Sequence, residues 1–146
     1  MELTGTQKPL EVNCIPVNDR VPDETNLAKK IRKRYPEAYK RYKDRISPFW
    51  VKNRGNVAFS FTNDKKVIVW MFCIIHGFNQ IDYHAFQWCL DDLIKVLPAR
   101  AGTIAFPLDE LSMADRKQLE PVIQGFSRYT TLNILTDLRG LDELEI

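Results

Sequence analysis

The spacing of hydrophobic and polar residues divides the chain into alternating strand and helix candidates. The runs NVAFSF (56–61) and VIVWMFCII (67–75) have strand composition, and the polar segment TNDKK between them predicts a hairpin. The second run is apolar at nearly every position, as expected of a central strand covered on both faces. Helical spacing begins near Ile81 and predicts an amphipathic helix that ends before Pro98.

Weaker patterns complete the order of elements. Residues 10–15 (LEVNCI) predict a strand that ends before Pro16, because the residue preceding a proline favours extended geometry. Two helical pieces, about 23–34 and 36–45, are predicted to meet at Tyr35. The remaining predicted elements are a strand at 103–106, a helix at 113–126 and a strand at 131–135. This alternation predicts an α/β fold, a three-layer α/β/α sandwich around a mixed, mainly parallel sheet.

Length and composition favour one domain. A chain of 146 residues that is 45% hydrophobic can form one core but not two comfortable ones, so residues 1–146 are predicted to be a single domain with a short acidic C-terminal tail from about 137. The longest apolar run is far shorter than the roughly 20 residues of a membrane-spanning helix, and no signal-peptide pattern is present. We therefore expect a cytoplasmic protein with no membrane partner.

Cysteine and histidine usage gives no support for a metal site. The three cysteines are an odd number at wide spacings within apolar runs, so we expect reduced thiols that pack as small hydrophobes. His76 and His84 have no third residue at ligand spacing. We expect neither a metal nor a cofactor.

Charge is distributed unevenly along the chain. The net charge is only +2, but residues 29–45 hold nine of the 21 basic residues against Glu37 and Asp44. Such a basic helix is able to track nucleic-acid phosphates, and interleaved tyrosines at 35, 39 and 42 would add stacking. The side chains proposed for phosphate contact are Lys29, Lys30, Arg32 and Lys33. The alternative is a helix that simply presents a solvated face.

Several short stretches follow one another as they do in a known family. VN at 12–13, Asn18, LA at 27–28 and IRKRYP at 31–36 precede RGNVAFSF, VIVWMF and YHAFQWCLDDLIKVL with TIAFP. In this order and wording the chain resembles the macro domain. The resemblance is greatest to the branch of ADP-ribosyl glycohydrolases and antitoxins that remove ADP-ribose from protein carboxylates or DNA bases. It implies a site for ADP-ribose or a related nucleotide.

The first phosphate loop departs from the family pattern. Members of the family have glycines there, which let backbone N–H groups close around the diphosphate. This chain reads RVPDETNLA, with Asn26 and Glu24 in place of the two glycines. A carboxylate 4 Å from a phosphate charge is repelled by about 4 kcal/mol at an effective dielectric of 20. The departure predicts weak or lost ADP-ribosyl hydrolase activity.

The second loop also departs from the pattern. The resemblance places Ser112 where related glycohydrolases carry a catalytic aspartate, and the lysine that closes their central strand is missing from CIIHGF. If hydrolysis persists, we expect Asn18 to position the ribose and Asp109 or Asp115 to supply the carboxylate. The expected ligand-binding residues are Asn13, Asn18, Asp19, Asn26, Leu108, Ser112 and Phe78.

Each of these residues has a structural alternative. Asn18 is equally suited to capping the turn after Pro16 through an Asx bond. Asp19 lies ahead of a predicted helix, where acids stabilise the helix dipole without any further function. Two other functions stay open: a pseudoenzyme that acts through protein recognition as an inhibitor or adaptor, and nucleic-acid binding through residues 29–45.

Overall fold

A computed structural model describes most of the chain. The described residues are 10–18, 26–47, 53–62, 66–75, 80–96, 101–107, 111–126 and 133–135. Their elements are β1 (Leu10–Asn18), α1 (Asn26–Arg34), α2 (Pro36–Ile46), β2 (Val57–Phe61), β3 (Lys66–Ile75), β4 (Gln80–Ile81), α3 (Tyr83–Val96), β5 (Ala101–Ala105), α4 (Met113–Phe126) and β6 (Asn133–Leu135).

One sheet joins all the described strands. Its order is β2-β3-β1-β5-β6, and β4 pairs with β3 beside this path. The pairs β1 with β3, β1 with β5, and β5 with β6 are parallel, whereas β2 and β4 run antiparallel to β3. The prediction of a mixed, mainly parallel sheet is confirmed.

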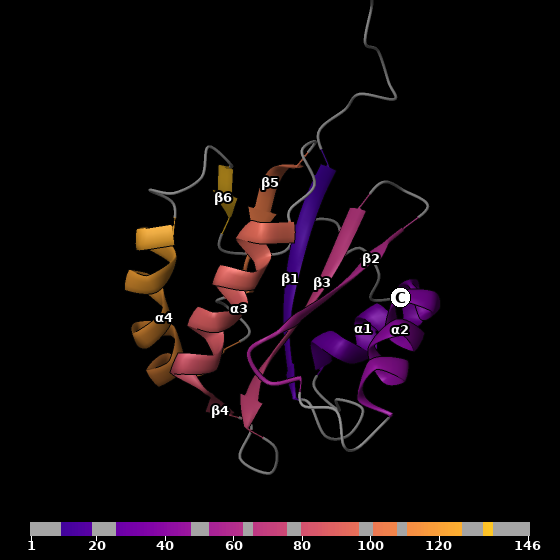
Figure 1. Cartoon of the computed structure of the whole chain (residues 1–146), viewed down its shortest axis with the longest axis horizontal. Coiled ribbons are helices and arrows are strands. Elements are labelled where there is room, and N and C mark those ends of the chain that lie inside the picture. The colour runs from indigo at the N-terminus through magenta and orange to yellow at the C-terminus, as the bar shows by residue number, and fades with distance from the viewer. Residues whose placement is uncertain are drawn as a thin grey trace, which may run out of the picture.

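Helices cover both faces of the sheet, so the three-layer prediction is also confirmed (Figure 1). Because side chains alternate along a strand, β3 is buried on both sides. Val69 and Met71 pack in the core under α3 and α4, while Trp70 and Phe72 pack in the core under α1 and α2. This double burial explains the nearly unbroken apolar run in β3.

The hydrophobic pattern predicted most helix positions. The two helices meet at Tyr35 as predicted, with Pro36 at the first position of α2. Helix α4 has the predicted bounds, 113–126, and α3 ends before Pro98. Periodicity locates such helices well because each must bury one continuous stripe.

The predicted end of the first strand was wrong. Strand β1 continues through Pro16 to Asn18. Strand β5 pairs with β1 only as far as Asn13, so beyond that point one side of β1 carries no ladder with β5. A residue without an N–H group is tolerated where the ladder is missing. The short strand β4 was not predicted, because two residues carry no periodic signal.

A single glycine fixes the turn that leads into β2. Gly55 has φ of 87°, a left-handed conformation that costs glycine little. A Cβ atom at this position would lie 2.9 Å from Cε3 of Trp88 on α3. The backbone and the indole ring are therefore packed too closely for any side chain at position 55.

The cysteines lie where their apolar neighbours predicted. Cys14, Cys73 and Cys89 are all buried in the core under α3 and α4, so they pack as small hydrophobes. Burial raises the pKa of the Cys14 and Cys73 thiols, and a contact with Cys89 adds to the effect on Cys73. Among the helices described, none has the length and apolar character needed to cross a membrane.

Candidate functional site

The carboxyl ends of the parallel strands define the candidate site. Strands β1, β3 and β5 all point to the same edge of the sheet, and α3 and α4 begin at that edge (Figure 1). Helix N-termini present unpaired N–H groups, so such an edge favours anionic ligands. In an open α/β sheet it is also the usual location of a ligand site.

Asn18 lies at this edge as the last residue of β1. The pairing between β1 and β3 shifts register between Val17 and Asn18, because β3 has one extra residue, Cys73, between their partners Phe72 and Ile74. Irregularities of this kind, which include β-bulges, are common near functional sites. Only 8% of Asn18 is exposed, and its carbonyl accepts a hydrogen bond from the Tyr42 hydroxyl at 3.2 Å.

An aromatic stack holds Tyr42 in place. Its ring lies 4.8 Å from the ring of Trp70 at an interplanar angle of 20°, and both side chains are fully buried. The Trp70 indole donates a hydrogen bond to the Ala38 carbonyl at 3.0 Å. Helix α2 is thereby fixed to the sheet, and through Tyr42 it fixes the end of β1.

Ser112 and Asp115 lie at the start of α4. The Asp115 N–H donates to Ser112 Oγ at 3.2 Å, and the Arg116 N–H donates to the Ser112 carbonyl at 2.9 Å. Ser112 is therefore the N-cap of α4. Asp115, in the first turn, is 9% exposed, and its carboxylate is favoured there by the helix dipole. Ser112, which the sequence resemblance placed where related glycohydrolases carry a catalytic aspartate, is therefore a helix cap.

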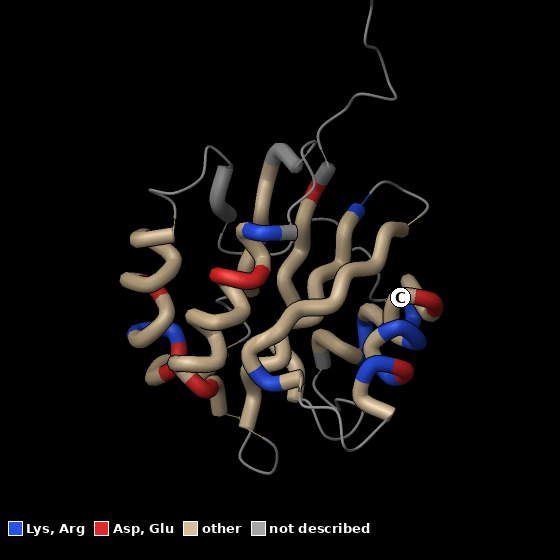
Figure 2. The backbone as a smooth tube through the Cα atoms, viewed as in Figure 1, with Lys and Arg blue, Asp and Glu red and all other residues tan. Residues whose placement is uncertain are grey.

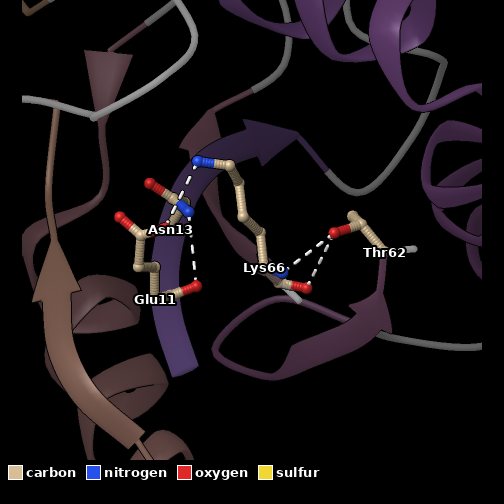
Figure 3. Close-up of polar contacts among 4 residues, drawn as sticks. All are labelled: Glu11, Asn13, Thr62 and Lys66. Carbon is tan, nitrogen blue, oxygen red and sulfur yellow. Dashed lines mark hydrogen bonds and ion pairs between the residues drawn. The ribbon is translucent and has the colours of Figure 1, made fainter. Parts of the chain in front are cut away.

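Asn13 does not lie with these residues. It is 2% exposed, and its amide donates to the Glu11 carbonyl at 3.4 Å (Figure 3). Glu11 in turn forms an ion pair of 3.4 Å with Lys66, the first residue of β3. Five residues of extended strand separate Asn13 from Asn18, roughly 17 Å. Asn13 therefore belongs to a polar group nearer the amino end of β1.

Several predicted residues are outside the described part of the chain. These are Asp19, Phe78, Leu108 and Asp109. Asn26 begins α1, but only its backbone is described. Their roles stay predictions.

Comparison with known proteins agrees with this geometry. No protein-family model matches the sequence, and no curated protein matches it. Solved structures do match. The macrodomain of Mycobacterium tuberculosis DarG superposes with a TM-score of 0.68 at 19% identity, covering 88% of each chain. The macrodomain of Thermus aquaticus DarG gives 0.72 at 16% identity, covering 91% of this chain and 92% of the other.

A macrodomain protein from Streptomyces coelicolor gives a TM-score of 0.70 at 15% identity, covering 91% of this chain and 90% of the other. The chain has the macrodomain fold. The family resemblance in the sequence is thereby confirmed at the level of structure. At these identities the comparison establishes the macrodomain fold alone.

One acidic residue at the same edge of this macrodomain fold was not predicted. The Asp82 carboxylate accepts a hydrogen bond from the Ala85 N–H at 3.1 Å, which caps α3, and lies 3.6 Å from Nη1 of Arg54. An aspartate directly before a helical pattern is the signal that would have identified it. Because the helix was predicted to begin near Ile81, Asp82 was predicted to lie inside the helix and not to be its cap. Its observed contacts are structural.

Most of the described basic residues lie on α1 and α2, and the others are spread over the rest of the fold (Figure 2). Lys29, Arg32 and Lys33 are exposed, and Lys30 is half-buried. Tyr39 and Tyr42 are 5% and 0% exposed, so neither is available to stack on nucleic-acid bases. Any nucleic-acid contact by these helices would rest on charge, with little help from aromatic stacking. Within the described ranges, no cluster of His, Cys, Asp or Glu is suited to hold a metal ion.

Proposed function

We propose that this macrodomain binds ADP-ribose or a related nucleotide at the carboxyl edge of its sheet, with weak or lost ADP-ribosyl hydrolase activity. The observation that carries the proposal is the anchoring of Asn18. The Tyr42 hydrogen bond fixes its backbone carbonyl at the end of β1, where the pairing with β3 changes register. A residue held in this way is suited to orient a ribose without reorganisation.

Helix N-termini at the same edge support binding of the diphosphate. A single anion gains from the N–H groups and the dipole of a nearby helix start. Here, however, the first loop carries Asp19, Asp23 and Glu24 and has no glycine. Repulsion between these carboxylates and a diphosphate argues for modest affinity.

Weak hydrolysis is expected because of the residue type at the start of α4. Ser112 caps the helix in the position that resembles the family's catalytic aspartate, and a hydroxyl is not a base at neutral pH. Asp115 is the described carboxylate nearest in sequence to that position. Its backbone N–H is committed to the Ser112 cap in the first turn of α4. Asp109 is the other expected donor of a carboxylate.

Calorimetric titration tests the binding step. ADP-ribose is expected to bind with micromolar or weaker affinity, and AMP more weakly still. Replacement of Asn18 by alanine is expected to reduce affinity about tenfold, the loss of one hydrogen bond to a ligand hydroxyl. The control is Gln118→Ala, at an exposed position in the middle of α4. No heat with millimolar ADP-ribose would refute the proposal.

Turnover of ADP-ribosylated protein and DNA tests the hydrolase step. Slow or undetectable release of ADP-ribose is expected. Any residual rate should fall in Asp109→Ala or Asp115→Ala, and not in Glu120→Ala on the exposed face of α4. Rapid turnover, or full activity in the double variant at 109 and 115, would contradict this assignment.

Nucleic-acid binding is the second candidate, favoured by the exposed cations of α1. Phosphate contacts release counterions, so affinity for DNA or RNA would fall steeply with salt. Replacement of Lys29, Lys30, Arg32 and Lys33 by glutamine should abolish it. Binding that is independent of salt would exclude this candidate.

A further inference from the structure

A groove runs between α2 and the edge strand β2, away from the nucleotide site. One stripe of α2, at positions 37, 40, 41, 44 and 45, faces residues 58–61 of β2 across a volume of about 650 Å³. A second hollow of about 370 Å³ continues toward Tyr35 and Thr62 and shares Glu37, Ala38 and Phe61 with the first. The groove therefore follows the length of β2.

Among the described strands, β2 pairs with β3 alone and stands at one end of the sheet order (Figure 1). The Thr62 N–H donates to the Lys66 carbonyl at 2.9 Å, and the Phe72 N–H donates to the Asn56 carbonyl at 3.1 Å. In an antiparallel strand, the backbone N–H and C=O groups of successive residues point alternately to one side and the other. The backbone groups of even-numbered residues of β2 therefore point toward β3, and those of odd-numbered residues point outward.

The outward groups are satisfied at one end of β2 only. The Val57 N–H donates to the Asp92 carboxylate at 3.0 Å, which confirms the outward direction. For Phe59 and Phe61, the described part of the chain supplies no partner to the outward N–H and C=O groups. An edge strand with free backbone groups is a template for another strand.

The groove also contains a buried hydroxyl with no partner. Ser60 is 7% exposed, lines the groove, and has no hydrogen-bond partner for its Oγ atom among the described residues. This Oγ atom lies beneath the surface of the groove, so the hydroxyl itself is not a contact for a partner. Arg41, across the groove, is exposed and has no ion-pair partner in the described ranges.

We propose that β2 accepts an extended segment of an acidic partner protein as an added strand. Its backbone would pair with the outward groups of Phe59 and Phe61, as in other cases of strand addition. On the α2 side, an acidic side chain of the segment would pair with Arg41. On the opposite side, apolar side chains would cover Phe61, which is 65% exposed.

Charge selects this occupant over a second copy of the chain. The groove side of α2 carries three basic residues, Lys40, Arg41 and Arg45, against Glu37 and Asp44, and Lys40 pairs with Asp44 at 2.9 Å. Pairing of β2 with another β2 would bring two such helices together, with repulsion between them. An acidic strand meets the same helix with attraction. The proposal does not depend on ADP-ribose binding, because the groove and the carboxyl edge are different surfaces.

Amide exchange and titration with a defined peptide test the proposal. The probe is a fluorescein-labelled peptide, Val-Glu-Val-Glu-Val-Glu-Val, and the control is its Val-Lys counterpart. Saturable binding of the acidic peptide is expected, with slowed exchange at the amides of Phe59 and Phe61. The amides of Ala58 and Ser60, which face β3, should change little. N-methylation of every second peptide residue removes the N–H groups along one edge of the peptide strand. Binding should weaken about tenfold when the removed groups are those that face β2, and little when they face away.

Variants of the groove locate the contact. Arg41→Glu is expected to weaken the acidic peptide about tenfold. Lys43→Glu is the matched control, because it makes the same charge change on α2 outside the groove. Equal affinity for the two peptides, no binding at millimolar peptide, or insensitivity to N-methylation would overturn the proposal. The proposal would also be overturned by a dimer, measured by sedimentation, whose interface is placed at β2 by slowed exchange of the Phe59 amide. Displacement of the peptide by duplex DNA would overturn it as well.

Discussion

The two helical layers of this macrodomain position its candidate site in different ways. The α1 and α2 layer acts through the core, where the stack of Trp70 and Tyr42 fixes the carbonyl of Asn18. The α3 and α4 layer acts through local caps, with Asp82 at the start of α3 and Ser112 at the start of α4. One side of the site is therefore coupled to global packing, while the other is set by a few residues near each helix start.

The largest effect is expected from Trp70→Ala. Removal of a fully buried indole leaves a cavity and breaks the bond to Ala38, which should cost about 3 to 5 kcal/mol of unfolding free energy. Because Tyr42 loses its support, ADP-ribose affinity should fall in the fraction that stays folded. Urea unfolding and calorimetry measure the two effects.

Leu93→Ala is the control from the opposite layer. Leu93 lies on α3 and is fully buried, and its truncation should cost about 2 to 5 kcal/mol. Affinity for ADP-ribose per folded molecule should stay unchanged, since Leu93 belongs to the core under α3 and α4, whereas Trp70 and Tyr42 belong to the core on the other face of the sheet. Equal losses of affinity in both variants would show that the two layers do not differ as described.

A second effect, specific to the α3 and α4 layer, is expected at high pH. Burial holds the pKa of the Cys14 and Cys73 thiols above the value of 9.0 that applies to the unfolded chain. The native state thus retains protons that the unfolded chain loses. Stability is complete below about pH 9 and should fall above it, by up to about 1.4 kcal/mol per pH unit for each thiol. Unfolding of Cys14→Ala across this range should show a shallower slope, and an unchanged slope would contradict the assignment.

Loss of the α4 cap should have a smaller effect. Ser112→Ala removes the acceptor of the Asp115 N–H and is expected to cost about 1 to 2 kcal/mol. The first turn of α4 should fray, which hydrogen exchange at Asp115 and Arg116 would detect. Ser47→Ala, at the exposed end of α2, is the control and should be nearly neutral. Equal exchange in both variants would argue against the cap.

The smallest effect on stability is expected from Tyr42→Phe. The ring and its stack remain, while the hydrogen bond to the Asn18 carbonyl is lost, at a cost of about 1 kcal/mol. Nucleotide affinity should fall more than in Tyr83→Phe, a half-buried tyrosine on α3. Unchanged affinity in Tyr42→Phe would show that Asn18 does not depend on this bond.

Sequence periodicity predicted the layers better than the details of the site. Helices α2 and α4 and the hairpin of β2 and β3 follow from residues that repeat on one face, which burial requires. The continuation of β1 past Pro16 depends on where β5 stops pairing, and that is a tertiary property. A single strand pattern carries no such information.

The roles of the site residues stay predictions, but the structure shows where the described ones lie. Asn18 and Asp115 were expected to lie at the site and are found at the carboxyl edge, because each is next to the end of a recognisable element. Asn13 is also polar within the same strand, yet it lies toward the opposite end. Residue type shows what a side chain is able to bind, but strand register decides which side chains meet. The groove beside β2 had no sequence signal, since an edge position depends on the whole sheet order.

The close approach of Gly55 to Trp88 has a consequence for how this sequence is able to diverge. The two positions are 33 residues apart in the chain, yet a Cβ atom at position 55 would lie 2.9 Å from the Trp88 ring. The residue types at 55 and 88 are therefore not able to change independently. In a homologous chain, any residue other than glycine at 55 should be accompanied by a smaller residue at 88. The left-handed backbone would still limit the choice at 55 mainly to asparagine or aspartate.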